Sequence, residues 1–164
     1  MSIPQWIPSI IELKEFSGNW EIYLENLYVI FTNDFIKSKP KFNDTELNIK
    51  RHPKTNEKEA TFWHLISTGK IEEDREPDLR RCERICWPKP IIENSNDTGV
   101  KIWRNKRKGE TRILLWFEAI EYLVVLAERT GYLLFWTAYP VIQDHSKRKL
   151  NKEYEQSRKD SQIS

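Results

Sequence analysis

The clearest hydrophobic pattern in the chain lies between residues 111 and 141, where three apolar runs are separated by short polar stretches. In residues 112–118 the side chains fall into two interleaved sets with a period of two, which is the period of a pleated strand. Residues 122–127 and 132–141 are the second and third runs, and residues 100–106 also alternate. The pattern predicts four consecutive strands that pair as an antiparallel β-meander.

Short polar turns separate these predicted strands. Arg107-Lys108-Gly109-Glu110 is typical of a hairpin loop, and Thr130-Gly131 is typical of a tight turn in which glycine takes a positive φ. Strict alternation in the last run then predicts its two faces. One face carries Tyr132, Leu134, Trp136 and Ala138, and the other carries Leu133, Phe135, Thr137 and Tyr139.

The first half of the chain has helical periodicity instead. Apolar residues recur every three or four positions in residues 19–37, which predicts an amphipathic helix with Ser17 as its N-cap. A second helix is expected over residues 57–67, because Asn56 and Glu59 resemble a capping box and Gly69 follows.

Shorter elements are expected between and after these segments. Leu47 and Ile49 alternate as in a short edge strand, and Pro77 favours a helix over residues 77–85. Residues 90–93 are read as the beginning of a strand. Asp144 is expected to cap a final helix over residues 144–159.

Together these elements predict an α+β fold, with N-terminal helices packed on a four-stranded antiparallel β-meander and followed by a basic C-terminal helix. A chain of 164 residues is long enough for one domain, residues 1–164. Its expected parts are an irregular arm (1–16), a helical part (17–86), the antiparallel sheet (90–141) and the C-terminal helix (144–159).

The apolar runs and the cysteines of the sequence bear on the protein's location and on metal binding. No apolar run approaches the roughly 20 residues that cross a bilayer, and the N-terminus lacks the pattern of a signal peptide. We therefore expect a cytoplasmic protein without a membrane partner. Cys82 and Cys86 lie four residues apart without a matching His or Cys pair, so no metal site and no cofactor are expected.

Charge is unevenly distributed although the net charge is only +2. Residues 101–112 hold six bases and one acid, and residues 145–159 hold six bases and two acids. Two basic segments beside an aromatic sheet suit a polyanion such as RNA, although each could also be a solvated surface. The candidate RNA-binding residues are Arg80, Arg81, Arg104, Lys106, Arg107, His145, Lys147 and Arg148.

Three segments of the sequence resemble bacterial and phage-associated members of the superfamily of barnase, EndoU, colicin-type and RelE-like ribonucleases. The fold of this superfamily is called the BECR fold. The segments are TFWHLIS (61–67), PDLRRCERICWPKPIIE (77–93) and RILLWFEAIEYLVVLAERTGYLLFWTAYPV (112–141). The resemblance covers roughly residues 55–155. It implies metal-independent cleavage of RNA, in which the ribose 2′-hydroxyl attacks the adjacent phosphate at a site that combines a helix histidine with basic and hydroxyl residues of the sheet.

Four residues fit that chemistry as candidate catalytic groups. His64 suits a proton-transfer role at neutral pH, and Arg112 suits phosphate binding. Thr137 and Tyr139 place two hydroxyl groups on one face of an apolar strand. The alternative for His64 is a structural histidine, and the alternative for Arg112 is an exposed strand end. Thr137 and Tyr139 could instead be a structural pair whose hydroxyls satisfy each other or bind the N-terminal arm. Trp136 is interpreted as a core residue.

These observations lead to a functional hypothesis and two alternatives. The hypothesis is an endoribonuclease that acts as a toxin or defence effector and is restrained by a cognate antitoxin or inhibitor protein. The first alternative is a non-catalytic RNA- or protein-binding module on the same fold. The second is a structural interaction domain whose Trp and Tyr residues form a partner surface.

Overall fold

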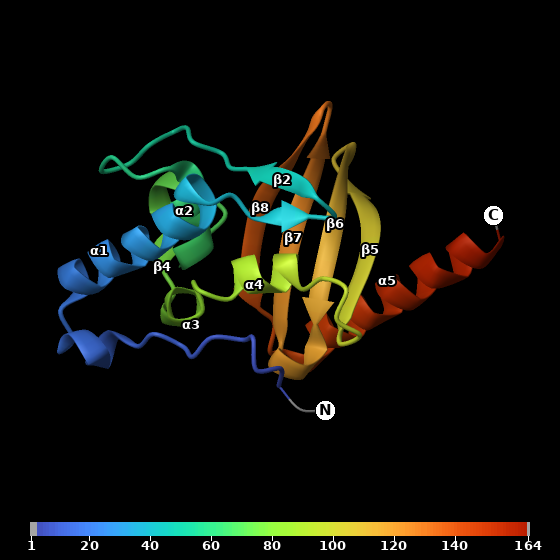
Figure 1. Ribbon diagram of the computed structural model, residues 1–164, viewed down its shortest axis with the longest axis horizontal. Coiled ribbons are helices and arrows are strands. Elements are labelled where there is room, and N and C mark those ends of the chain that lie inside the picture. Colours follow the sequence, from blue (N-terminus) through green and yellow to red (C-terminus); the bar gives the residue numbers. More distant parts are fainter. Residues whose placement is uncertain (1–2, 164) are drawn as a thin grey trace.

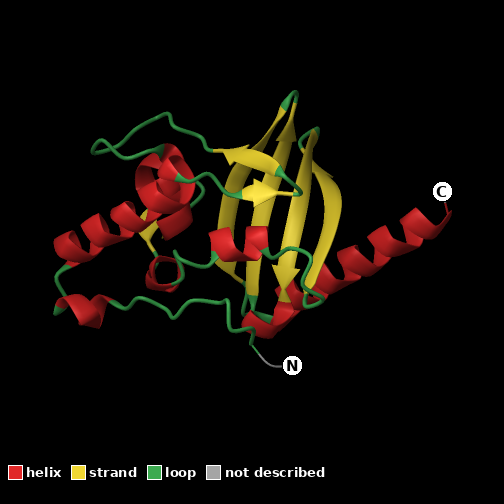
Figure 2. Ribbon diagram, in the orientation of Figure 1, coloured by secondary structure: helices red, strands yellow, loops and turns green. Residues whose placement is uncertain are grey.

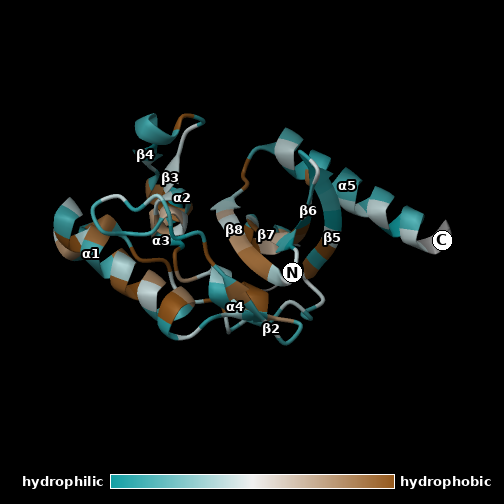
Figure 3. Cartoon of the chain, turned by 90° about the horizontal axis from the view of Figure 1, so that it is seen from above, coloured by the Kyte–Doolittle hydropathy of each residue, from teal (hydrophilic) through white to brown (hydrophobic). Residues whose placement is uncertain are grey.

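A curled six-stranded sheet lies at the centre of the computed structural model, which describes residues 3–163 (Figures 1 and 3). The strand order is β1-β2-β8-β7-β6-β5. The strands are β1 (Lys41–Phe42), β2 (Thr45–Asn48), β5 (Val100–Arg107), β6 (Glu110–Phe117), β7 (Tyr122–Arg129) and β8 (Tyr132–Pro140). A separate small ladder pairs β3 (Ser67–Thr68) with β4 (Glu76–Pro77).

The α+β class is confirmed, but the prediction of a purely antiparallel four-stranded sheet is wrong. Strands β5 to β8 pair with their sequence neighbours in antiparallel fashion. β2 adds to the outer side of β8 in parallel, with Leu47 opposite Leu133, and β1 pairs antiparallel with β2. The expected edge strand is therefore an inner strand of a mixed sheet. Its pairing joins segments more than 80 residues apart, and no local turn signals such a contact.

The helices surround the sheet unevenly (Figure 2). On the side of β8 lie α1, α2 and α3, while α4 contacts the strands β1 and β7. The long helix α5 lies behind the sheet and projects past β5 (Figure 1). The helical elements are η1 (Leu13–Phe16), α1 (Trp20–Phe31), the π-helical η2 (Thr32–Lys37), α2 (Ala60–Ile66), η3 (Glu72–Asp74), α3 (Leu79–Glu83), α4 (Pro88–Glu93), η4 (Glu118–Ile120) and α5 (Asp144–Ile163).

Several predicted boundaries are wrong, each for a local reason. Asn19 rather than Ser17 caps α1, because its side-chain oxygen accepts the Ile22 amide at 3.1 Å. α2 begins only at Ala60, since Asn56 and its neighbour have positive φ values of 49° and 64° and cannot start a helix.

The boundaries of the elements between residues 77 and 93 also differ from the prediction. The Asp78 carboxylate accepts the amides of the first turn of α3, so this helix begins at Leu79 and Pro77 lies in β4. Residues 90–93, predicted as a strand, belong to α4. Pro88 at its first position favours that helix. None of the described helices is both long and apolar enough to cross a membrane.

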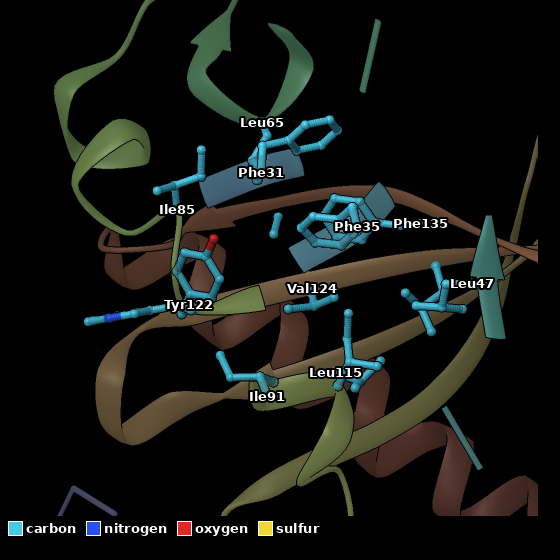
Figure 4. Close-up of a cluster of buried hydrophobic side chains, with 14 of the residues drawn as sticks. Phe31, Phe35, Leu47, Leu65, Ile85, Ile91, Leu115, Tyr122, Val124 and Phe135 are labelled. Atoms are coloured by element: carbon cyan, nitrogen blue, oxygen red, sulfur yellow. The ribbon is translucent and has the colours of Figure 1, made fainter. Parts of the chain in front are cut away.

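The main hydrophobic core lies on one face of the sheet, here called the core face (Figure 4). Strand alternation directs Leu115, Val124 and Phe135 to this face, where each is fully buried. Phe35 of η2 stacks on Phe135 with 4.6 Å between ring centroids. The core face thus fixes the N-terminal helices to the sheet, and burial of such aromatic side chains is the main source of stability.

The opposite face, here called the α5 face, carries a smaller apolar cluster that includes Trp103, Leu114 and Trp116. Leu150 and Tyr154 of α5 pack against this cluster. These contacts hold α5 against the β5 side of the sheet and leave part of β7 and β8 uncovered.

Polar contacts fix the position of α5 as well. Asn151 accepts hydrogen bonds from the Trp116 indole at 3.1 Å and the Lys101 ammonium at 2.9 Å, and it donates to Glu118 at 3.0 Å. Two residues further along the helix, Glu153 accepts the Trp103 indole at 2.8 Å. Because these partners come from the two strands β5 and β6 and from η4, the helix has one defined position, and it forms one wall of a cleft.

Candidate functional site

A groove runs along the α5 face, between α5 on one side and β8 with α3 on the other. It consists of two cavities of about 410 Å³ and 230 Å³, which share Arg107, Leu123, Tyr139 and Leu150 in their walls. We call the two together the arginine groove. Its other polar lining residues are Asp78, Arg80, Asn105, Arg112, Thr137, Gln143, Ser146, Lys149 and Glu153.

A β-bulge in β8 determines which side chains enter this groove. Val125 of β7 lies opposite Thr137, but the next residue, Leu126, lies opposite Phe135. Trp136 is therefore an extra residue, and such a bulge re-aims the side chains around it. Trp136 lines the smaller cavity together with Thr137 and Tyr139. The prediction that Trp136 and Thr137 lie on opposite faces is wrong, because it assumed unbroken alternation.

Tyr139 lies at the centre of the groove and forms part of both cavities. The guanidinium carbon of Arg81, from α3, lies 4.9 Å from the centre of its ring. Burial raises the pKa of the Tyr139 hydroxyl above its ordinary value of 10, although Arg81, Arg107 and Arg112 act in the opposite direction. At neutral pH the hydroxyl is protonated and can donate a hydrogen bond or a proton.

Arg112 is held in the wall of the groove by two contacts. Its Nε donates to Glu110 at 2.9 Å, and its guanidinium carbon lies 4.5 Å from the centre of the Trp136 ring. Glu110 also pairs with Arg129, so this carboxylate is shared between two arginines. The Arg112 side chain is thus positioned in advance, which favours planar recognition of a phosphate.

Asn105 lies opposite Arg112 in the β5–β6 ladder and brings a second polar group to the smaller cavity. Its amide nitrogen donates to Glu153 at 2.6 Å. Its amide oxygen is buried and has no hydrogen-bond partner among the described residues. Since a buried acceptor without a partner is costly, this oxygen is available for a donor of a bound molecule, such as a sugar hydroxyl.

His64 is not brought together with the other three catalytic candidates. It lies on α2, and its Nε2 is 3.0 Å from both carboxylate oxygens of Glu72. Its backbone oxygen accepts hydrogen bonds from Arg75 at 3.3 Å and Arg81 at 3.0 Å. His64 lines neither cavity of the groove. In this position its side chain links α2 to η3, and its carbonyl holds the arginine that covers Tyr139.

The eight predicted RNA-binding residues divide between the groove and the outer surface. Arg80 and Arg107 line the larger cavity, Arg81 contacts Tyr139, and no ion pair of Arg80 or Arg107 occurs among residues 3–163. The remaining five lie outside the groove. Arg104 pairs with Glu128, and Lys147 pairs with Glu121. Strand alternation places Lys106 on the other face from Arg107, and His145 and Arg148 are exposed.

Six polar groove residues were missed at the level of sequence: Asp78, Asn105, Gln143, Ser146, Lys149 and Glu153. Ser146 and Lys149 could have been found, because Ser146 lies one helical turn before Leu150, the apolar residue that faces the sheet, and Lys149 lies directly before it. Asn105 has no comparable signal. Its position in the groove depends on how far α5 lies from β5.

Neither known proteins nor the metal-ligating side chains of the chain add a further assignment. No protein-family model, no curated protein and no solved structure matches the chain. Within the described part of the chain, no three His, Cys, Asp or Glu side chains form a group that could hold a metal ion. Cys82 and Cys86 are free thiols outside the groove, and burial raises the pKa of Cys86 to about 11.

Proposed function

We propose that this protein is a metal-independent endoribonuclease, related to the BECR ribonucleases, whose active site is the arginine groove. One observation carries the proposal. Arg81, Arg107 and Arg112, from three different elements, converge on Tyr139: Arg81 lies 4.9 Å from the centre of its ring, and Arg107 and Arg112 line the smaller cavity with it. This convergence of positive charge, which Glu110 offsets only in part, favours binding of an anion, and a phosphodiester is an anion of suitable size and geometry.

The proposed reaction begins with a phosphodiester in the groove. The ribose 2′-oxygen attacks the adjacent phosphorus and releases its proton to solvent, while the bond from phosphorus to the 5′-oxygen breaks. The products are a 2′,3′-cyclic phosphate and a 5′-hydroxyl. Arg107 and Arg112 stabilise the charge that grows on the non-bridging oxygens, which is an electrostatic role that fixed guanidinium groups perform well.

Tyr139 is proposed as the proton donor to the leaving 5′-oxygen. Its hydroxyl is protonated at neutral pH, as an acid catalyst requires. Thr137 and the Asn105 amide oxygen would orient the ribose through hydrogen bonds. In this scheme His64 has no proton-transfer role, because its ring nitrogen is bound to Glu72 outside the groove.

The test is cleavage of total RNA in EDTA by purified protein and by a matched pair of variants. Tyr139→Phe removes only the hydroxyl, so cleavage should fall by ~10²–10⁴-fold while the melting temperature stays close to that of the wild type. His64→Ala should keep substantial cleavage. A Tyr139→Phe protein that cleaves at the wild-type rate, or a folded His64→Ala protein that does not cleave, would refute the assignment.

The pH dependence of cleavage gives an independent check. A histidine acid or base would produce an inflection near pH ~6–7, where histidine side chains ordinarily titrate. With Tyr139 as the acid, the rate should rise through this range without an inflection and decline only above the ordinary pKa of tyrosine, 10, because burial raises that pKa. An inflection near neutrality that persists in both His64→Ala and His145→Ala would contradict Tyr139 as the acid and would also exclude these two histidines.

A second candidate function is RNA binding without cleavage. It is favoured by the lack of an uncommitted base in the groove: no imidazole lines it, and its two carboxylates, Asp78 and Glu153, already accept hydrogen bonds from α3 and from Trp103. This alternative predicts salt-dependent binding of RNA with no cleavage product. The same purified protein decides between the two functions when binding and cleavage are measured together.

We also propose that the ribonuclease acts as a toxin held in check by a cognate inhibitor protein. An inhibitor that covers the groove would need acidic side chains to match its arginines. Expression of the wild-type chain should arrest growth, whereas expression of Tyr139→Phe at equal abundance should not. Equal growth of both strains would remove the toxin role and leave the cleavage assay unaffected.

A further inference from the structure

A second cavity borders the arginine groove, and the function proposed above does not use it. Its volume is about 470 Å³, and Trp136 forms part of its wall as well as part of the wall of the smaller groove cavity. The indole therefore separates two neighbouring spaces. A chain-like ligand that enters one of them can continue past Trp136 into the other.

The charges around this second cavity have one sign. Lys39, Lys50, Arg51 and Arg129 line it, and no acidic residue does. Arg51 and Arg129 have carboxylate partners behind the wall, Glu59 at 3.8 Å and Glu110. Lys50 is exposed and has no ion-pair partner within the described chain, and Lys39 contacts only the Asn48 amide, at 3.0 Å. The two lysines leave a net positive charge for an anion.

The wall that carries Lys50 is held rigidly. The Thr61 hydroxyl of α2 accepts the Lys50 amide at 2.8 Å and donates to the Lys50 carbonyl at 3.0 Å. The Ala60 amide also donates to the Arg51 carbonyl, at 3.3 Å. Because α2 fixes this backbone, the lysine side chain extends from a defined point, and less order has to be gained when a ligand binds.

Aromatic surface is available in the same cavity. Tyr132, at the tip of the β7–β8 hairpin, is 42% exposed although it is a large ring. Trp136 lies four residues after Tyr132 in β8. The guanidinium carbons of Arg112 and Arg129 lie 4.5 Å and 5.9 Å from the centre of the Trp136 ring. Cationic side chains beside exposed aromatic rings are typical of proteins that bind single-stranded nucleic acid, because bases stack on the rings and phosphates lie near the cations.

From these observations we infer that the second cavity is a binding site for the neighbouring nucleotides of a single-stranded RNA, with Tyr132 stacking on a base and Lys50 contacting a phosphate. This inference rests on the proposed function, because it extends the path of the same strand beyond the scissile phosphate. It assigns the preferred substrate as single-stranded RNA several nucleotides long. A duplex would present its bases to each other rather than to Tyr132.

The test uses fluorescent oligouridylates whose 2′-hydroxyls are methylated, so that binding is measured without cleavage. The two-nucleotide probe is chosen to occupy the arginine groove alone, and the six-nucleotide probe is chosen to extend into the second cavity as well. Wild-type protein should bind the longer probe more tightly. In Lys50→Glu/Tyr132→Ala this gain should fall by roughly tenfold or more, as expected from loss of one stacked base and one phosphate contact, while affinity for the short probe is kept.

Lys159→Glu is the control for charge, since Lys159 is exposed near the far end of α5 and lines none of these cavities. Its affinities for both probes should match the wild type. If the double variant binds both probes as the wild type does, the second site is refuted and the arginine groove stands. If wild-type protein binds neither probe, the proposed RNA function fails, and the inference fails with it.

Discussion

The two faces of the sheet are built from alternate residues of the same strands, yet they differ in almost every physical property. The core face is continuous and apolar: Leu115, Val124 and Phe135 are fully buried beneath the N-terminal helices. The α5 face has a smaller apolar cluster, and beyond it the strands present arginines, an asparagine, a threonine and a tyrosine to a groove. A strand that is rigidly packed on one face can therefore position polar groups on the other face.

The largest effect is expected from breaking the core face. Phe135→Ala should lower the free energy of unfolding by about 3–5 kcal/mol, because it removes a fully buried ring and leaves Phe35 without its stacking partner. Chemical denaturation measures this loss. Leu134→Ala, at the neighbouring position of β8, is the control and should cost less, because Leu134 lies outside the main core cluster. Equal losses would mean that membership of the main core cluster adds no stability at this strand.

A smaller loss of stability is expected where α5 is attached to the other face. Asn151→Ala leaves the indole nitrogen of the fully buried Trp116 without its acceptor, at a cost of about 1–3 kcal/mol. Lys101 loses a partner in the same change. Gln156→Ala, on the exposed side of the helix, should have no measurable effect. If Asn151→Ala is as stable as the wild type, packing of Leu150 and Tyr154 alone holds α5.

The contrast between the faces is sharpest at two adjacent residues of β5. Arg107 lines the groove, whereas Lys106 is exposed and directed to the opposite side. Arg107→Ala should weaken RNA binding by about tenfold and reduce the slope of log affinity against log salt by ~1, because one phosphate contact is lost. Lys106→Ala should change neither quantity. Equal effects of the two substitutions would show that general surface charge, not the groove, binds RNA.

The smallest effect concerns pH and the attachment of α5. Burial by itself raises the pKa of Glu118, but hydrogen bonds from Asn151 and Lys101 outweigh it, and the net pKa lies below its ordinary value of 4.5. A lowered pKa adds stability above pH 4.5, and this contribution is lost as the pH falls through the folded-state value. Glu118→Gln should flatten the acid side of the stability curve. An unchanged curve would assign acid sensitivity to other carboxylates.

The sequence alone was informative wherever structure depends on near neighbours. Alternation and turn residues locate the strands between residues 100 and 140, and Gly109 and Gly131 adopt the positive φ values, 78° and 85°, that their turns require. Thr137 and Tyr139 of β8 line one cavity together with Arg112 of β6, which lies two strands away. The strand positions follow from the geometry of a strand, which every residue repeats.

Only the tertiary structure decided which residues surround Tyr139. Arg81 reaches it from α3, and the position of α3 depends on packing against α2 and β8. The bulge at Trp136 moves one side chain to the groove, and the parallel pairing of β2 with β8 supplies the wall beyond it. His64, a suitable acid or base by residue type, lies outside the groove for the same reason. Contacts between distant segments depend on the shape of the packed whole, which no local pattern of the sequence encodes.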